Sequence, residues 1–298
     1  MDVEMRHLRA LVTVAEELNF TRAAERLHLT QQALSGQIRQ LEDRVGTRLV
    51  ERDPRRVHLT AAGTALCDQA RPLLVGAQQA IAAARAIGGE TPRLTVGYIA
   101  PLTRRITAPT MQLFTDRYPE VEVTIHFASL LDSSGGLRDG AADVAILYGE
   151  FEHAGLELRF LFREPRGIAI PAKHPLASKP QVTIEDFIAE PLIAVPVSDH
   201  VNRDFWTAAR HRAGKPPRIG ATVQTLDGLI EAISAGLGIA STIAPVIDAL
   251  GSSAGVVFRL VSGLEPLDFW VGRHEGDERV QVTAFMQAAV AAHLREHD

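Results

Sequence analysis

A group of amide, hydroxyl and guanidinium side chains near the start of the chain has the types and spacing needed to bind nucleic acid. Gln31, Gln32, Ser35, Gly36 and Arg39 share one face if residues 31–45 form a helix. An amide can form two hydrogen bonds with adenine, and a hydroxyl can pair with several base edges. The pattern predicts a DNA-reading face, although a three-helix packing unit with a solvated polar face would also explain it.

Two further arginines are placed to contact the DNA backbone. Residues 47–52 and 55–60 read as two short strands around the turn at Asp53-Pro54, which is the pattern of a hairpin or wing. Arg55 and Arg56 then lie at its tip. Arginines there suit phosphate or minor-groove contact, which gives affinity that depends on salt and carries no sequence choice.

Three helices are expected to position the polar face. Thr21 is a candidate N-cap for a helix over 22–27, and Thr30 for a helix over 31–45 that Gly46 ends. Apolar residues recur at helical spacing in the first helix, where they form one stripe: Leu8, Leu11, Val12, Ala15 and Leu18. In the third helix, the stripe that we expect to be buried consists of Leu34, Ile38, Leu41 and Val45.

A long helix is predicted after the wing, over 60–87. Its apolar residues alternate spacings of four and three through three heptads: Leu66, Ala70, Leu73, Ala77, Ala80, Ala84 and Ile87. The helix could pack on the core of its own chain, but the narrow stripe favours a seam with a second copy. Pro72 should bend the helix, and Gly88 to Pro92 reads as a hinge.

From Arg93 onward strand-like and helix-like runs alternate. Alternation of this kind predicts βαβ units with mostly parallel sheets. About 200 residues suffice for two such lobes with a ligand crevice between them. The fold class expected is therefore mixed: a winged helix-turn-helix head, a linker helix and an α/β body of two lobes.

Composition excludes several classes of protein. The net charge of −5 excludes a polybasic coat for nucleic acid, and the one cysteine, Cys67, excludes an intrachain disulfide framework and a multi-cysteine zinc site. We find no membrane-length apolar run and no secretory signal, so a cytoplasmic protein with no membrane partner is expected. No nucleophile elbow, H-E-x-x-H motif or dinucleotide loop is evident, so we expect no enzyme activity, no cofactor and no metal.

The head resembles the helix-turn-helix of LysR-type transcriptional regulators. The similarity lies in residues 19–35, 37–42, Gly46, 49–52 and 59–63, with further matches at 114–121, 140–146 and 235–240. The resemblance spans essentially the whole chain. It implies a winged DNA-binding domain over 1–60, a dimerising linker helix over 61–89, and an effector domain over 92–298 that resembles periplasmic binding proteins. Lobe I would cover about 92–163 and 267–298, and lobe II about 164–266.

The resemblance also implies partners and DNA-contact residues. The partners are double-stranded promoter DNA, further copies of the chain as a homodimer or homotetramer, a small-molecule effector, and RNA polymerase. Carried over by position, the DNA contacts are Thr21, Thr30, Gln31, Gln32, Ser35, Gly36, Arg39, Arg55 and Arg56. The chain departs from the family at Gln32, where proline is common, and at Gly36, where arginine is common. Gly36 offers no side chain for a base contact.

The resemblance places the effector between the lobes. The corresponding positions are Ala100, Leu102, Thr103, Ser129, Val197, Ser198 and Thr225. Amides at a helix start with a nearby hydroxyl favour a carboxylate or similar anion. Against this, Ala100, Pro101 and Leu102 are apolar where relatives often carry serine or threonine, which indicates a less polar ligand. Thr103 and Thr225 could instead be helix caps only.

Two other classes of protein remain open from the sequence. One is a solute-binding module without DNA regulation, which the missing signal disfavours. The other is a small-molecule enzyme on the same α/β body, which lacks a convergent catalytic set. Binding to promoter DNA would separate the regulator from both.

Arg55→Ala tests the wing. If Arg55 neutralises one phosphate, the variant should bind all duplexes more weakly, and the slope of log affinity against log salt should fall by about one unit. Titrations of labelled duplex at several salt concentrations measure both quantities. An unchanged slope would show that Arg55 contacts no phosphate.

Overall fold

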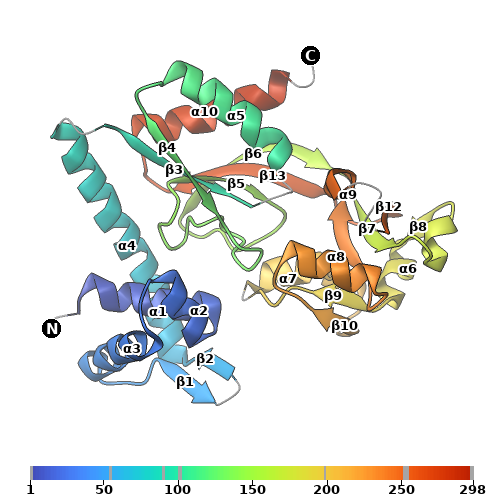
Figure 1. Ribbon diagram of the computed structural model, residues 1–298, viewed down its shortest axis with the longest axis horizontal. Coiled ribbons are helices and arrows are strands. Elements are labelled where there is room, and N and C mark those ends of the chain that lie inside the picture. Colours follow the sequence, from blue (N-terminus) through green and yellow to red (C-terminus); the bar gives the residue numbers. More distant parts are fainter. Residues whose placement is uncertain are drawn as a thin grey trace. The chain divides into compact units, whose positions relative to one another are not determined.

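The chain folds into two compact units in a computed structural model that describes residues 3–53, 56–88, 91–99, 103–197, 199–250 and 255–295 (Figure 1). The first unit spans Met1–Pro92 with the short segment Gly136–Ala141. The second spans Arg93–Gly135 and Ala142–Asp298.

The first unit is a three-helix core with a hairpin and a long final helix. Its elements are α1 (Met5–Glu17), α2 (Phe20–Arg26), α3 (Gln31–Val45), β1 (Val50–Asp53), β2 (Arg56–Leu59) and α4 (Ala61–Ile87). Leu34, Ile38 and Leu41 on α3 are fully buried among apolar residues of α1, α2 and the first turns of α4. Val45 is an exception to the predicted stripe, since it lies at the last position of α3 and is 38% exposed.

The caps of α2 and α3 follow local chemistry, with one correction. Thr30 caps α3 by accepting a hydrogen bond from the Ala33 amide at 3.2 Å, and Gly46 ends the helix at a φ of 79°. Thr21 does not cap α2. The helix begins two residues earlier, at Phe20, because Asn19 Oδ1 accepts from the amides of Thr21 and Arg22 at 2.9 and 3.1 Å.

The hairpin joins the helices through two close contacts. β1 and β2 pair antiparallel, from the pair Val50 and Leu59 to the pair Asp53 and Arg56, and Glu42 of α3 accepts from the amides of Leu49 and Val50 at 2.9 and 3.1 Å. Gly63, in the first turn of α4, passes so close to the hairpin that a Cβ there would lie 2.0 Å from the Leu49 carbonyl oxygen. Only glycine allows this approach.

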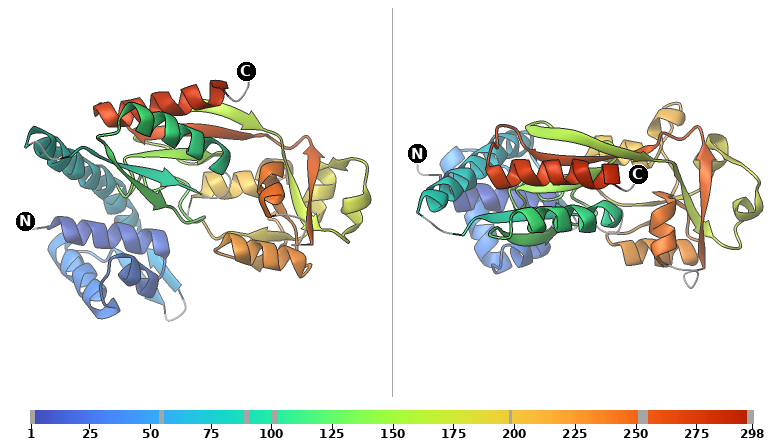
Figure 2. Two further views of the ribbon diagram at one scale, coloured as in Figure 1. Left: turned by 45° about the horizontal axis from the view of Figure 1, so that its top comes forward. Right: turned by 90° about the horizontal axis from the view of Figure 1, so that it is seen from above.

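Lobe I of the second unit is a five-stranded sheet in the order β4-β3-β5-β13-β6. Two helices, α5 (Arg104–Arg117) and α10 (Val280–Arg295), lie side by side over one face of this sheet (Figures 1 and 2). The strands are β3 (Arg93–Tyr98), β4 (Glu122–Phe127), β5 (Val144–Tyr148), β6 (Leu156–Glu164) and β13 (Leu267–His274).

Lobe II contains a four-stranded sheet in the order β11-β7-β12-β8 and a separate parallel pair, β10-β9. A single parallel bridge connects Leu192, the first residue of β9, with Ile239, the residue before β11. Its strands are β7 (Arg166–Pro171), β8 (Val182–Thr183), β9 (Leu192–Ala194), β10 (Ile219–Thr222), β11 (Ala240–Ile243) and β12 (Val256–Ser262). Its helices are α6 (Ile184–Ala189), α7 (His200–Trp206), α8 (Leu226–Ser234) and α9 (Ala244–Leu250), with 3-10 turns η1 (Pro175–Ser178) and η2 (Ala209–His211).

The sheets are mixed, so the prediction of mostly parallel sheets is wrong. β3 pairs parallel with β4 and β5, whereas β13 pairs antiparallel with β5 and β6, and β7 pairs antiparallel with β11 and β12. The reason is that the chain crosses between the lobes twice, from β6 to β7 and from β12 to β13 (Figure 2). A strand that returns from the other lobe enters the sheet in the opposite direction.

Two glycine substitutions make a matched test of the first unit. Gly63→Ala should lower the free energy of unfolding by about 2 kcal/mol, because the hairpin backbone must move. Gly36→Ala should raise it by about 1 kcal/mol, because a Cβ at this helical position meets nothing within 4 Å. Calorimetric unfolding of the full chain measures both. Equal effects of the two substitutions would contradict the close contact at Gly63.

Candidate nucleic-acid interface and effector cavity

The outer face of α3 presents the polar residues that the sequence singled out. Gln31, Gln32 and Arg39 are exposed, and Ser35 and Gly36 are half-buried. Arg39 Nε donates to the Ser35 carbonyl at 3.3 Å, which holds the guanidinium along the helix. The structure thus brings these five residues together on the side opposite the buried stripe.

The remaining predicted DNA contacts are placed less uniformly. Thr21 is exposed at the start of α2, whereas the Thr30 hydroxyl already serves as the cap of α3. Arg55 lies outside the described residues. Arg56 begins β2, and only its backbone is described.

A buried histidine that the sequence reasoning missed holds α3 against α1. His7 is fully buried, and its Nδ1 lies 3.3 Å from the Glu4 amide and 3.2 Å from Arg44 Nη1, both of which are donors. Its Nδ1 must therefore accept, which leaves Nε2 to donate to Gln40 Oε1 at 3.2 Å. The contacts with Gln40 and Arg44 fix the angle of α3, but they join residues over 30 positions apart, so no local pattern shows them.

The predicted seam on α4 divides into two parts. Ala70 is fully buried against the core of its own unit, so for this residue the prediction of a contact with a second chain is corrected. Leu66 is half-buried against the same core, and its contact with a second chain stays a prediction. Beyond them, Leu73 is 59% exposed, Ala77 is half-buried, and Ala80 and Ala84 are exposed. The side chain of Ile87 lies outside the described residues.

Cys67 belongs to the same core. It is buried beside Ala70 and Leu74, and desolvation raises the pKa of its thiol to about 12. A thiol with so high a pKa is scarcely ionised near neutral pH, so Cys67 acts as an apolar packing residue.

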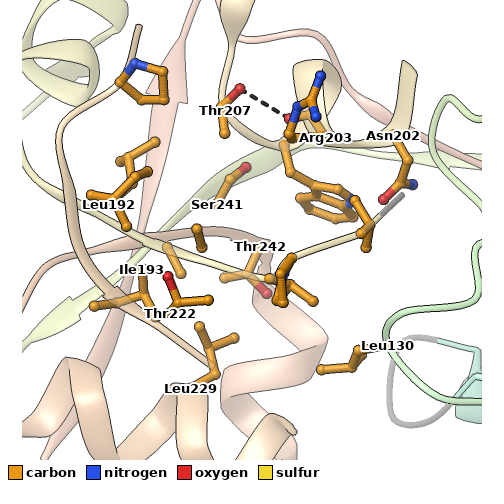
Figure 3. A pocket seen from close by; sticks show the side chains of 18 of the residues that line it. Leu130, Leu192, Ile193, Asn202, Arg203, Thr207, Thr222, Leu229, Ser241 and Thr242 are labelled. Carbon is orange, nitrogen blue, oxygen red and sulfur yellow. Dashed lines mark hydrogen bonds between the residues drawn. The ribbon is translucent and has the colours of Figure 1, made fainter. Parts of the chain in front are cut away.

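A cavity of about 630 Å³ opens between the lobes and extends into lobe II (Figure 3). Lobe I contributes Leu130, Asp132, Ser133 and Tyr148. Lobe II contributes most of the wall, and the greater part is apolar, including Leu192, Ile193, Leu229, Ile233, Val246 and Ile247. The volume is within the range of small-molecule sites.

Few of the predicted effector positions line this cavity. Val197 does, and it is buried. Ser129 is exposed next to Leu130, and Thr225 caps α8 by accepting from the Gly228 amide at 3.1 Å. Thr103 is fully buried and donates its hydroxyl to the Ile99 carbonyl, so the structure assigns it to packing and leaves it no surface for a ligand. Ala100, Leu102 and Ser198 lie outside the described residues.

Polar contacts bridge the lobes at one edge of the cavity. Asp199 is buried, and its Oδ2 accepts from the Ser133 hydroxyl at 2.8 Å and from the Glu152 amide at 3.0 Å. Asn202 Nδ2 donates to the Glu150 carbonyl at 3.2 Å, and Arg210 forms a bidentate pair with the Glu150 carboxylate. Ser133 and Asn202 also line the cavity, so the same residues join the lobes and face a ligand.

A buried arginine reinforces the first crossover. Arg166 begins β7, its side chain is fully buried, and its guanidinium carbon lies 3.7 Å from the centre of the Phe205 ring. Nη1 donates to the Phe205 carbonyl at 2.9 Å, and Nη2 lies 3.3 Å from Glu265 near the second crossover. Desolvation lowers the pKa of Arg166 to about 10 although the Glu265 carboxylate acts against this, so the group remains charged at neutral pH.

The described residues carry neither a grouped metal-ligand set nor a membrane-spanning helix. We find no three His, Cys, Asp or Glu side chains grouped so that they could hold a metal ion. Within the same ranges, none of the helices combines the length and the apolar character that crossing a membrane requires.

Comparison with known proteins identifies both units. Residues 5–64 match "Bacterial regulatory helix-turn-helix protein, lysR family", and residues 88–293 match "LysR substrate binding domain". The transcriptional regulator AlsR of Bacillus subtilis (strain 168) is 35% identical over 239 residues, which is 79% of each chain. The chain belongs to the LysR family of transcriptional regulators.

Other family members agree along the whole chain. The Hca operon transcriptional activator HcaR of Escherichia coli (strain K12) is 30% identical over 270 residues, 89% of each chain. Among solved structures, full-length BenM is 20% identical with a TM-score of 0.57 over 99% of this chain and 98% of that one. Full-length CbnR, solved in complex with its target DNA, is 23% identical with a TM-score of 0.52 over 98% and 100%. The structural similarity to BenM and CbnR shows that the chain shares their fold. As a LysR-type regulator, the protein combines a DNA-binding head with an effector-binding domain.

Leu73→Glu tests whether the exposed stripe on α4 pairs two chains. Because Leu73 is 59% exposed within its own chain, the substitution should leave the monomer folded. At an apolar seam the charge would be buried without a partner, so the variant should become monomeric. Light scattering measures the mass. Thr64→Glu, on the opposite side of α4, is the control and should remain associated; a Leu73→Glu variant that stays dimeric would exclude this seam.

Proposed function

We propose that this LysR-type regulator reads promoter DNA with the outer face of α3, in paired copies joined through α4. The observation that carries the proposal is the division of α3 into a buried apolar stripe and an outer face of amide, hydroxyl and guanidinium groups. A helix with this polarity can enter the major groove, where amide and guanidinium groups distinguish bases. CbnR, which shares the fold, has been solved with its target DNA, which supports the same partner here.

Within this proposal the named residues take different roles. Gln31, Gln32, Ser35 and Arg39 contact base edges or nearby phosphates, and Gly36 leaves room for the DNA to approach. Arg55 and Arg56 contact the backbone from the wing, with Thr21 and Thr30 at the helix starts beside the phosphates.

Pairing through α4 gives the heads a fixed spacing. The exposed Leu73 and the alanines beyond it form the apolar surface that a second copy covers, which makes a homodimer or, with two dimers, a homotetramer. Paired heads must match half-sites separated by about one helical turn or a multiple of it.

Regulation follows from a shift between two orientations of the lobes. A small molecule in the cavity touches Ser133 and Asn202, the residues that also bridge the lobes, so its binding favours one orientation over the other. The linker helices then change the angle of the DNA-reading heads, the bend of the DNA and the access of RNA polymerase. In this role the protein acts in the cytoplasm as a regulator and performs no catalysis.

Gln31→Ala tests this function directly. Full-length protein should shift a DNA fragment from the promoter region beside its own gene in a gel, at protein concentrations that leave unrelated DNA free. Loss of one amide–base contact should reduce the ratio of specific to non-specific affinity about tenfold. Gln69→Ala, an exposed glutamine on α4, is the control and should leave the ratio unchanged. Equal weakening of both affinities by Gln31→Ala would refute direct base reading, and failure of the unmodified protein to prefer its promoter would refute the function.

A further inference from the structure

We propose that the effector is an uncharged, mainly apolar molecule with one hydroxyl or primary amide end, rather than a carboxylate or similar anion. This inference rests on the proposed function, because it specifies the ligand of the same cavity. It follows from which charged and polar groups line that cavity and from which of them are already hydrogen-bonded.

The described wall offers an anion no buried cation. The cationic residues of the wall are Arg203 and Lys215, and both are exposed. Arg203 also lies 3.6 Å from the Asp204 carboxylate, with both side chains 53% exposed. A carboxylate deep in the cavity would therefore lose its hydration without gaining a charged partner, which costs several kcal/mol.

Lobe I adds a negative charge to the same wall. The half-buried Asp132 lines the cavity near Tyr148. Burial, together with the charge of Asp132, raises the pKa of the Tyr148 hydroxyl, so this group stays protonated and remains a donor. The Asp132 carboxylate would repel an anion placed against it.

Three residues that line the cavity are more than nine-tenths buried. Each has a polar side-chain atom that forms no hydrogen bond with another described residue. These atoms are the Tyr148 hydroxyl, Asn202 Oδ1 and the Thr242 hydroxyl, on residues 8%, 5% and 6% exposed. The Asn202 amide nitrogen, by contrast, is bound to the Glu150 carbonyl. A fourth hydroxyl, that of Ser241, is buried in the same wall without a partner among the described atoms. Figure 3 shows Asn202, Ser241 and Thr242 around the cavity.

These atoms specify the polar end of the ligand. Asn202 Oδ1 accepts only, so the ligand must donate one hydrogen bond to it. The hydroxyls of Tyr148 and Thr242 can donate, so the ligand must also accept. A hydroxyl or a primary amide does both without charge, and the apolar wall of Leu192, Ile193 and Leu229 receives the remainder of the molecule.

Three probes of nearly equal shape test this assignment on the full-length protein: 4-phenyl-1-butanol, 4-phenylbutyrate and 4-phenylbutylamine. They differ in the charge of the end group, so affinities from calorimetric titration compare a neutral, an anionic and a cationic end directly. We expect the alcohol to bind at least tenfold more tightly than the carboxylate and the amine.

Tyr148→Phe removes only the hydroxyl and should weaken binding of the alcohol about fivefold. Without ligand, the unfolding temperature of the variant should be unchanged or slightly higher, because a buried hydroxyl without a partner is lost. A tyrosine with a purely structural role would not combine weaker binding of the alcohol with an unchanged unfolding temperature. Tyr118→Phe, which changes a tyrosine of lobe I that does not line the cavity, is the control and should bind the alcohol normally.

The outcomes separate the ligand class from the regulatory function. Tighter binding of the carboxylate or the amine, or no binding of any probe, overturns the proposed ligand class. Normal binding of the alcohol by Tyr148→Phe also overturns the assignment of that hydroxyl. If the alcohol binds as expected but leaves the affinity for promoter DNA unchanged, the ligand class stands and the regulatory role of the cavity fails.

Discussion

Burial of one side of α3 is the constraint on which the DNA recognition that we propose for this protein depends. Leu34, Ile38 and Leu41 are inaccessible to solvent and pack among α1, α2 and α4. Because the helix cannot rotate without exposing these side chains, its amide and hydroxyl groups must face outward. The buried His7, between α1 and the Gln40 and Arg44 side chains of α3, adds a polar contact that fixes the tilt of the helix. Burial of three apolar residues therefore determines which side chains can meet DNA.

The effector domain combines a sheet in each lobe with a partly polar junction between the lobes. A buried apolar cluster holds lobe II together, whereas the contacts across the junction include hydrogen bonds and ion pairs, such as those of Asp199 and Arg210, beside the edge-on packing of Tyr148 against Trp206. Polar contacts can be exchanged for others at little net cost in free energy, since water or a ligand replaces the lost partner. A junction of this kind allows two orientations, and a ligand that touches Ser133 and Asn202 can bias them.

Features set by neighbouring residues were predictable from the sequence, and features set by distant pairs were not. The bounds of α3 follow from Thr30, Gly46 and the helical spacing of its apolar residues. The cap of α2 was misassigned because Asn19 and Thr21 are both good caps and only the fold decides between them. Heptad spacing on α4 could not separate Ala70, buried in its own core, from the exposed Leu73, because both positions satisfy the same periodicity. The mixed sheets and the cavity wall depend on segments more than 50 residues apart, which no local pattern encodes.

Base reading by α3 in paired copies can be tested most directly by probing the DNA itself. Dimethyl sulfate methylates guanine N7 in the major groove, so protection of that atom reports occupancy of the groove in which we propose that α3 lies. With the full-length protein on its promoter fragment, we predict protected guanines in two patches, about ten base pairs or a multiple of ten apart. A bound complex that leaves every guanine N7 as reactive as in free DNA, or that protects a single patch only, would contradict the account.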